Sequence, residues 1–320
     1  MRPFATHSVP RFEGEGSRRH QDVPLWRLAW NSLPTLMANP RAFLQVRSFV
    51  QFAGFPRSGH SLIGSIIDAH PSAVISHELD AMGLIRKGVP LSLLHDMVAD
   101  NSRAFSEAGR YWNGLRYQVP GYAHGIKDRP LVVGDKKGDW AVRWCAEDPG
   151  LLDRAQRLLG SGSRWILVAR NPFDNIATMS LRKGREYDRL RIANSADTFR
   201  RALREAQERG RVSASALDEM IDDYETLCET TEQMKTRLPD GDWHEIVYER
   251  FTKHPFGAIE DLLTFLGLNA DPTFVTSAAS IVRESRHRSR DDVVWSAQQK
   301  MRVAAMTRRF SFLRAYAEND

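Results

Sequence analysis

Short runs of apolar residues alternate along the chain with longer segments whose apolar residues recur every three or four positions. The short runs, which predict strands, are 49–53, 74–75, 131–133, 165–169 and 244–248. The segments with helical spacing are 25–44 (interrupted by Pro34 and Pro40), 59–69, 150–159, 173–182, 197–209, 214–237, 256–266 and 293–309. Buried strands that alternate with amphipathic helices predict an α/β fold, in which helices cover a parallel sheet.

Two regions show neither the short apolar runs of strands nor the apolar spacing of helices. Residues 1–24 mix Gly, Pro, Ser and charged residues, and we interpret them as a mobile N-terminal tail in front of a single domain, 25–320. Residues 100–130 are rich in Gly, Tyr, Asn and Arg, and we expect a loop-rich insertion there. We extend this interpretation to two insertions, at about 80–130 and 183–200.

Composition narrows the possible functions only a little. The 320 residues include 45 Lys and Arg against 40 Asp and Glu, a net charge of +5, which suits an anionic ligand but is too small to indicate nucleic acid. The two cysteines exclude a disulfide scaffold and a cysteine-based zinc site. The sequence has no apolar run near the roughly 18 residues of a membrane span and no signal-peptide pattern, so we expect a cytoplasmic protein.

The sharpest motif is Gly54-Phe55-Pro56-Arg57-Ser58-Gly59-His60-Ser61, which lies between the first predicted strand and a predicted helix. A glycine-rich loop at a helix N-terminus offers backbone N–H groups to an anion, and Arg57 adds a positive charge. His60 stands where a nucleotide triphosphatase has its loop lysine, which counts against ATP or GTP hydrolysis. The alternative is a simple strand–turn–helix corner whose glycines serve only the turn.

A second anion site is predicted where the strand 165–169 ends. Arg170 follows this strand, and Thr178 lies eight positions later on the next predicted helix, with Ser180 as an alternative hydroxyl. An arginine fork and a hydroxyl can converge on one phosphate group. Taken alone, Arg170 could equally be a surface charge at a strand end.

Together these motifs resemble the sulfotransferases that use 3′-phosphoadenosine-5′-phosphosulfate (PAPS), particularly the tyrosylprotein and carbohydrate branches. The resemblance covers the loop Phe55–Ser61, the segment Ile67–Pro71, the Arg170–Thr178 pair, and the stretch from Val247 to Leu268. It implies a P-loop-like three-layer α/β/α sandwich, PAPS as donor, the bisphosphate PAP as product, and no metal. By this resemblance the 5′-phosphosulfate is bound by Pro56, Arg57, Ser58, Gly59, His60 and Ser61, and the 3′-phosphate by Arg170 with Thr178 or Ser180.

Sulfuryl transfer needs a base for the acceptor proton and positive charge on the leaving phosphate. We choose Glu78 as the base because it follows the second predicted strand, at the sheet edge where parallel-sheet enzymes bind ligands. Its distance from Arg57 also resembles that of the catalytic glutamate in the tyrosylprotein branch. His77 is the second candidate, although it should point the other way on an extended strand, and His60 is a weaker one.

Positive charge can come from Arg57 and from Lys136, which follows the third predicted strand; Lys137 is the alternative. The resemblance also implies that a basic segment near the C-terminus, His287–Arg290, closes over the nucleotide, with Arg288 as a contact; the alternative is a run of solvated charges. Tyr111, Trp112, Trp140 and Trp144 could line an acceptor pocket, but aromatic residues are more often part of the core.

Two other functions remain open at this point: a P-loop kinase-like phosphotransferase, and a catalytically silent nucleotide-binding homologue. The acceptor cannot be read from the sequence and could be a carbohydrate, a peptide tyrosine, a lipid or a small molecule. We expect its specificity to reside in segments 80–130 and 183–200, and we expect no nucleic-acid partner. The oligomeric state is open.

Overall fold

The computed structural model describes residues 43–112, 115–125, 127–183, 214–283 and 288–317, with Arg201, Glu205 and Glu208. The predicted tail 1–24, nearly all of the predicted helix 25–44 and most of the predicted helix 197–209 lie outside these residues.

A five-stranded parallel sheet forms the centre of the protein, with the strand order β2-β5-β1-β6-β7. Each strand coincides with one of the five predicted apolar runs, so the prediction of a parallel α/β sheet is confirmed. A small antiparallel hairpin, β3 (Tyr111–Trp112) and β4 (Leu115–Arg116), stands apart from this sheet. The sheet strands are β1 (Ser48–Gly54), β2 (Ala73–Ser76), β5 (Val132–Asp135), β6 (Ser163–Ala169) and β7 (Trp243–Val247).

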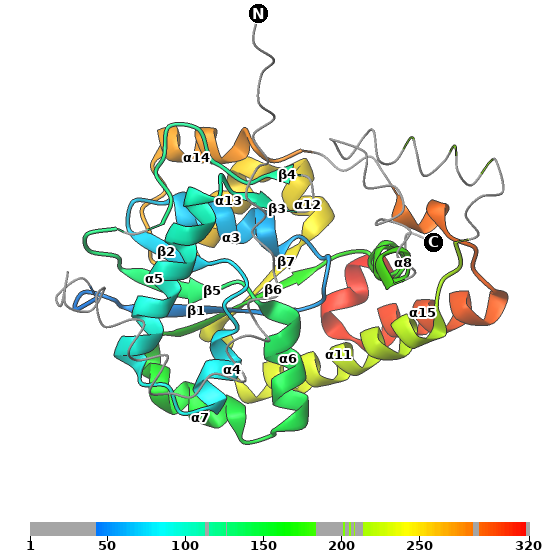
Figure 1. Cartoon of the computed structure of the whole chain (residues 1–320). Helices are drawn as coiled ribbons and strands as arrows, with labels where there is room; N and C mark the ends of the chain where they lie inside the picture. The colour runs from blue at the N-terminus through cyan, green and yellow to red at the C-terminus, as the bar shows by residue number, and fades with distance from the viewer. Residues whose placement is uncertain are drawn as a thin grey trace, which may run out of the picture.

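Helices cover both faces of the sheet and give the expected three layers (Figure 1). One face carries α3 (His60–Ala69), α12 (Tyr248–Lys253), α13 (Pro255–Phe265) and α14 (Pro272–Ala279). The other carries α4 (Ala81–Arg86), α6 (Gly138–Glu147), α7 (Leu151–Leu159) and α11 (Asp218–Arg237), while α5 (Leu91–Glu107) packs along β2. The short 3-10 turns are η1 (Gly160–Gly162), η2 (Asp240–Asp242), η3 (Ser289–Asp292) and η4 (Ser311–Tyr316).

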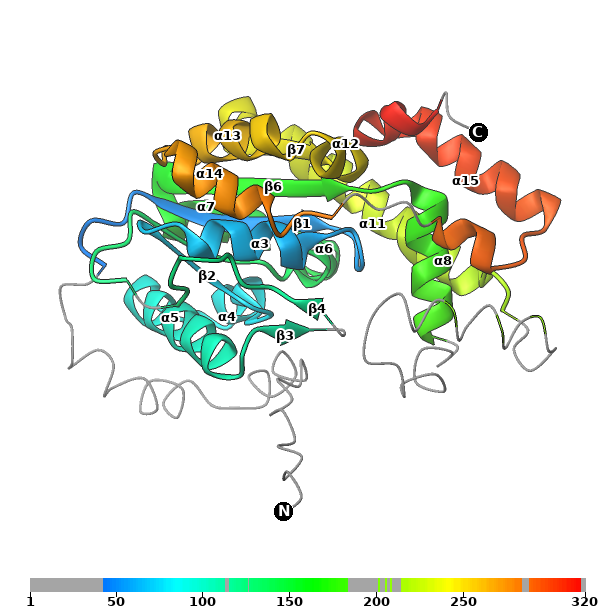
Figure 2. The same ribbon diagram turned by 90° about the horizontal axis from the view of Figure 1, so that it is seen from above.

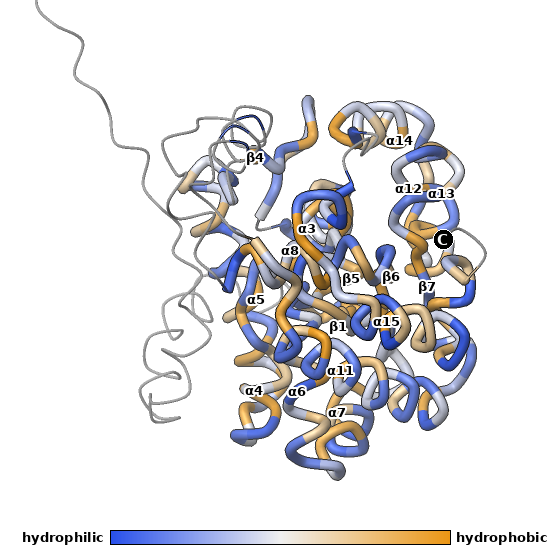
Figure 3. Tube along the Cα trace, turned by 90° about the vertical axis from the view of Figure 1, so that its right-hand side faces the viewer, coloured by the Kyte–Doolittle hydropathy of each residue, from blue (hydrophilic) through white to orange (hydrophobic). Residues whose placement is uncertain are grey.

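The core is divided by the sheet into two apolar layers, because successive side chains of a strand point to opposite faces. On β1, Phe49 packs into the layer beneath α4, α6 and α11, whereas Val50 and Phe52 pack into the layer beneath α3, α13 and α14. Figure 3 shows hydrophobic stretches in the central strands, surrounded by helices in which hydrophobic and hydrophilic turns alternate. Strands that are apolar on both faces therefore explain why the sequence shows continuous runs rather than alternation.

Because all five strands run parallel, their carboxyl ends meet at one edge of the sheet. At this edge β1 passes into the glycine-rich loop, β2 into the segment with Glu78, and β5 into Lys136. The helices α8 (Pro172–Lys183) and α15 (Ala297–Arg309) and the hairpin β3–β4 lie toward the same end, as Figure 2 shows. The fold thus collects the candidate residues at one edge.

Several element predictions need correction. The loop-rich interpretation is wrong for 91–107, which form α5; its apolar positions Leu94, Met97, Val98 and Phe105 do recur at helical spacing, but intervening polar residues dilute the pattern. The final helix begins at Ala297, after η3, and Tyr248 begins α12 instead of ending a strand. The short helices α6 and α14 were not predicted.

Within the described part of the chain, the structure contains no helix with both the length and the apolar character needed to cross a bilayer.

Candidate active site

The glycine-rich loop turns sharply between β1 and α3. Gly54 and Gly59 have φ values of 115° and 111°, and Arg57 between them has φ of 70°. A side chain at position 59 could not be accommodated, since its Cβ would lie 2.4 Å from the ring of Tyr248. Residues with positive φ between ordinary ones turn backbone N–H groups toward one side, and α3 begins here without a side-chain cap on its first turn. This geometry is the kind that can receive an anion.

Contacts from the neighbouring helix hold the loop in place. The side-chain amide of Asn175 on α8 donates to the Pro56 carbonyl at 2.8 Å, and the buried Ser58 hydroxyl donates to the Phe55 carbonyl at 2.9 Å. The Nε atom of Arg57 is buried and makes no hydrogen bond with any described residue. An unsatisfied buried donor inside a glycine-rich loop at a helix N-terminus indicates a place for a ligand oxygen.

His60 is part of the scaffold beneath the loop. Its Nε2 atom lies 3.1 Å from the carbonyl oxygen of Ala53, and its ring packs edge-on against Phe52. Burial, reinforced by the charge of Lys136, lowers the pKa of His60 to about 3, so the ring is neutral at physiological pH. This neutral, buried imidazole is held against the backbone of β1 and supports the loop from beneath.

Glu78 lies in a tight segment after β2 in which two residues adopt left-handed backbone conformations. Glu78 has φ of 63° and Asp80 has φ of 71°. The buried carboxylate of Asp135 at the end of β5 fixes this segment, because it accepts hydrogen bonds from the backbone N–H groups of Leu79 (3.2 Å) and Ala81 (2.8 Å). Unfavourable backbone conformations persist where the surroundings enforce them, often at functional sites.

The carboxylate of Glu78 forms ion pairs with the ammonium groups of both Lys136 and Lys137. Lys136 also donates to the Ser61 hydroxyl at 3.0 Å, so it joins Glu78 to the first turn of α3. Burial alone would raise the pKa of Glu78, but the two ammonium groups hold it below its ordinary value. Glu78 is therefore ionised, and it lies next to a cation that reaches the glycine-rich loop.

The His77 ring lies in an aromatic environment. Its ring stacks on Phe105 of α5 with centroids 3.8 Å apart, and Trp112 meets it edge-on at 4.8 Å. Burial and the charge of Lys136 lower its pKa well below the ordinary value. His77 and Glu78 face different surroundings, but both follow the last residue of β2 and Glu78 has a left-handed backbone, so the alternation expected of an extended strand does not apply here.

Arg170, at the end of β6, lies among the groups expected for the second anion site. One guanidinium nitrogen, Nη1, is 3.5 Å from the Thr178 hydroxyl and donates to the Arg57 carbonyl at 3.2 Å. The other, Nη2, lies 3.3 Å from the hydroxyl of Ser289 in η3. The structure thus brings together Arg170, Thr178 and the loop.

Two other predicted contacts lie elsewhere. The Ser180 hydroxyl accepts a hydrogen bond from the Leu217 backbone N–H at 3.1 Å, and it anchors the start of α11. Ser180 therefore does not belong with Arg170, because two further positions along a helix turn its side chain away from Thr178. Arg288 is exposed beside η3, and the neighbouring Ser289 makes the contact with Arg170 instead.

The C-terminal segment is fastened over α8 by charge and aromatic contacts. Asp174 accepts hydrogen bonds from the backbone N–H (2.9 Å) and Nη2 (3.2 Å) of Arg290, and the rings of Phe173 and Trp295 meet edge-on. Ser289 is held against Arg170 by this arrangement.

Sequence analysis missed Ser289, Asn175 and Asp135. Ser289 lies between Arg288 and Arg290 in the predicted basic segment, and its hydroxyl is not part of the charge pattern that marks the segment. Asn175 lies one helical turn after Asn171 on the helix that carries Thr178, so its position on the loop side could have been inferred from the period. Asp135 directly precedes Lys136 at a strand end, and nothing in the sequence distinguishes a scaffold carboxylate there from a catalytic one.

Solved structures similar to this chain have low sequence identity to it. A sulfotransferase from Alicyclobacillus acidocaldarius is 15% identical, with 86% of this chain and 97% of that chain covered and a TM-score of 0.44. Sulfotransferase STF9 from Mycobacterium avium is 11% identical, with 96% and 88% covered and a TM-score of 0.46. Mouse sulfotransferase SULT7A1, solved with PAP, is 14% identical, with 91% and 94% covered and a TM-score of 0.39.

No curated protein matches the chain in sequence. The model of the sulfotransferase family matches residues 50–272, which include the glycine-rich loop, Glu78, Lys136, Arg170 and Tyr248. This match spans more than half of the chain and contains every strand of the sheet except the first residues of β1. The chain therefore belongs to the sulfotransferase family.

Proposed function

We propose that this protein transfers a sulfuryl group from PAPS to a hydroxyl or amine acceptor. The observation that carries the proposal is the contact series Glu78–Lys136–Ser61, in which a carboxylate, an ammonium group and the start of α3 meet at the carboxyl edge of the sheet. A proton acceptor and an anion-binding helix terminus are thereby joined through one lysine. Sulfuryl transfer uses both functions at the same moment.

The cationic groups at this edge fit a donor with two separate anionic groups. The loop, with its uncapped helix and the unpartnered Nε of Arg57, suits the 5′-phosphosulfate. Arg170, Thr178 and Ser289 suit the 3′-phosphate. When bound, PAPS would supply the sulfuryl group on a phosphosulfate anhydride.

In the proposed reaction, the acceptor oxygen forms a bond to sulfur while the bond between sulfur and the 5′-phosphate oxygen breaks. Glu78 takes the acceptor proton. Proton removal by a positioned base raises the rate by about 10²- to 10⁴-fold. Arg57 and Lys136 stabilise the charge that develops on the departing phosphate. The reaction as written requires no metal.

Between the two lysines, Lys136 is the better candidate for the leaving group. It contacts both Glu78 and the loop hydroxyl of Ser61, whereas Lys137 pairs with Glu78 and lies at the start of α6. We assign Lys137 to the control of Glu78, because removing one of two neighbouring cations would raise the pKa of that carboxylate.

The two alternatives receive less support. A kinase-like phosphotransferase needs a loop cation where His60 is buried and neutral. A silent binding homologue has no use for an ionised carboxylate held beside the leaving-group cations.

The experiment is a transfer assay with [³⁵S]PAPS and four acceptors: p-nitrophenol, a tyrosine peptide, a disaccharide and a medium-chain alcohol. [γ-³²P]ATP with the same acceptors is the matched control. We expect ³⁵S in the product of at least one acceptor and no ³²P in any. Transfer of ³²P would favour the kinase, and tight PAP binding without transfer would favour the silent homologue.

A further inference from the structure

A second buried charge cluster lies behind the site, around the carboxylate of Asp68 at the end of α3. Asp68 is fully buried, and its carboxylate accepts hydrogen bonds from the hydroxyl of Ser102 and the backbone N–H of Ile75, each at 2.8 Å. The Nη1 atom of Arg110 and the Nδ1 atom of His124 lie 2.8 Å and 3.3 Å from the same carboxylate. Burial would raise the pKa of Asp68, but the charge of Arg110 holds it below the ordinary value.

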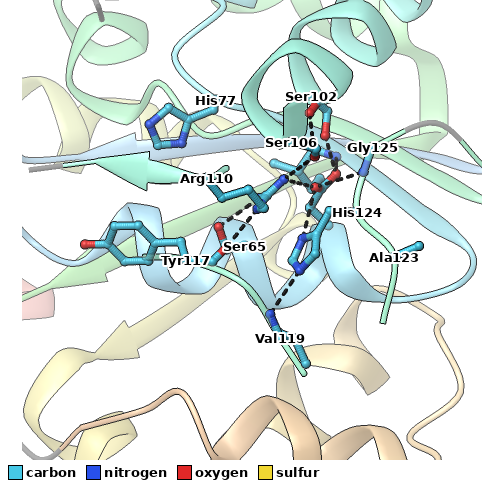
Figure 4. Close-up of polar contacts among 12 residues, drawn as sticks. Ser65, His77, Ser102, Ser106, Arg110, Tyr117, Val119, Ala123, His124 and Gly125 are labelled. Atoms are coloured by element: carbon cyan, nitrogen blue, oxygen red, sulfur yellow. Dashed lines mark hydrogen bonds and ion pairs between the residues drawn. The ribbon is translucent and has the colours of Figure 1, made fainter. Parts of the chain in front are cut away.

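Arg110 uses its whole guanidinium group within this cluster, as Figure 4 shows. Besides Asp68, it donates to the hydroxyls of Ser106 and Ser65, each at 3.0 Å, and to the Tyr117 carbonyl at 2.7 Å. Arg110 therefore ties together α3, α5 and the segment that follows the β3–β4 hairpin. Its own backbone is left-handed, with φ of 57°, which only a firmly fixed surrounding maintains.

From Arg110, a stack of side chains leads to the reacting groups. The guanidinium carbon lies 4.7 Å from the centre of the Phe105 ring, and Phe105 stacks on His77, which precedes Glu78. The ring of Trp112 touches the edge of His77 and has the Lys136 ammonium 5.4 Å from its centre. Trp112 and Glu78 thus border the same lysine, and Arg110 supports both.

We propose that Arg110, fixed by the buried carboxylate of Asp68, is the positioning residue of the acceptor side: it sets the places of Trp112 and of the His77–Glu78 segment relative to Lys136. This inference rests on the proposed sulfuryl transfer. Arg110 touches neither the loop donors nor Arg170, so its influence falls on the acceptor and on proton removal, while the donor site is unaffected.

The geometry requires arginine at position 110. The planar fork of arginine satisfies four acceptors in fixed directions, while the ammonium group of lysine has three donors and no plane to stack on Phe105. Arg110→Lys therefore keeps the positive charge that pairs with Asp68 but loses the planar guanidinium group. A displacement of about 1 Å at reacting groups can cost about 10²-fold in rate.

The test compares Arg110→Lys with Arg164→Lys as the matched control. Arg164 also binds a carboxylate and two carbonyls (Asp242 at 2.6 Å, Ser163 and Ser161), all through its Nη1 atom, but at the amino ends of β6 and β7. With the best acceptor of the ³⁵S panel, we expect Arg110→Lys to lower kcat/KM for the acceptor by about 10- to 100-fold and to change PAP affinity less than threefold. Arg164→Lys should leave both near wild type.

Asp68→Asn provides a second variant, which should reproduce the acceptor defect, again with PAP affinity kept. A third readout needs no acceptor: acrylamide quenching of Trp112, taken as the difference between each protein and its Trp112→Phe version, should increase in Arg110→Lys and not in Arg164→Lys. The proposal is overturned if acceptor kinetics and quenching are unchanged in folded Arg110→Lys, or if PAP affinity falls by the same factor as kcat/KM. Failure of wild type to transfer ³⁵S at all would instead contradict the proposed function.

Discussion

The guanidinium group of Arg170 donates a hydrogen bond of 3.2 Å to the backbone carbonyl of Arg57, although the two residues lie 113 positions apart in the chain. Arg57 belongs to the loop after β1, and Arg170 directly follows the neighbouring strand β6. This bond joins the two candidate anion sites into one unit. A ligand that fills both should therefore be distinguished from a ligand that fills only one.

Arg170→Ala should remove that distinction. We expect wild type to bind adenosine 3′,5′-bisphosphate more tightly than AMP, and the variant to lose most of this preference, since a charge-assisted hydrogen bond is worth about 1.5–3 kcal/mol. Calorimetric titration with both nucleotides measures this preference, and the affinity for AMP serves as the internal control. Arg288→Ala, next to the site but exposed, should have less than about threefold effect. Equal binding of the two nucleotides by wild type would refute the 3′-site.

The two lysines beside Glu78 should differ in their effects. Lys136→Met should lower the transfer rate by about 10²–10³, because a cation on the leaving phosphate is lost. Lys137→Met should act mainly through pH: since the lysines lower the pKa of Glu78, removal of one raises it, and activity should then be lost at a higher pH as the medium is acidified. The transfer rates of both variants, measured as a function of pH, test these two expectations. If Lys137→Met lost the rate and Lys136→Met shifted the pH dependence, the two roles would be exchanged.

His60→Leu should affect stability more than activity. The buried ring has a pKa of about 3 and a hydrogen bond to the Ala53 carbonyl, whose loss costs about 0.5–1.5 kcal/mol. We expect a lower Tm and a turnover within about threefold of wild type. A fall of about 10²-fold or more in a folded variant would mean that His60 takes part in proton transfer.

Asp80 makes stability depend on pH. Burial raises its pKa from 3.8 to about 6, so the folded state favours the protonated carboxyl; the resulting stabilisation is present below pH about 4 and is lost as the pH rises through 6. Asp80→Asn should preserve the left-handed backbone and the cap on Gly83. As the pH rises from 4 to 7, the free energy of unfolding of wild type, measured with urea, should therefore fall by about 1–3 kcal/mol relative to that of the variant. If the free energies of unfolding of the two proteins changed in parallel with pH, Asp80 would not titrate in this range.

The sequence predicted the sheet and the ends of its strands well because its buried strands are apolar on both faces. Residues that directly follow a strand, such as Glu78, Lys136 and Arg170, were found for the same reason: parallel strands deliver their carboxyl ends to one edge. Arg57 was found because it lies between two glycines of a recognisable motif. Those glycines have positive φ, a conformation in which few other residues could replace them.

What the sequence could not provide were contacts between distant segments. Ser289 meets Arg170 across 119 positions, and Asp68 meets Arg110 across 42, with no local pattern that pairs them. Likewise, the pairing of Glu78 with two lysines depends on the left-handed turn after β2, which non-glycine residues rarely adopt and which no composition signal predicts.

The most direct test is the turnover of Glu78→Gln, measured with [³⁵S]PAPS and the best acceptor beside the affinity for PAP. Glutamine keeps the size of the side chain but cannot take a proton, and it leaves Lys136 free to hold the nucleotide. We predict a fall in turnover of about 10²–10⁴ with PAP affinity unchanged or tighter. Turnover within threefold of wild type in the folded variant would contradict the assignment of Glu78 as the base of a sulfuryl transfer.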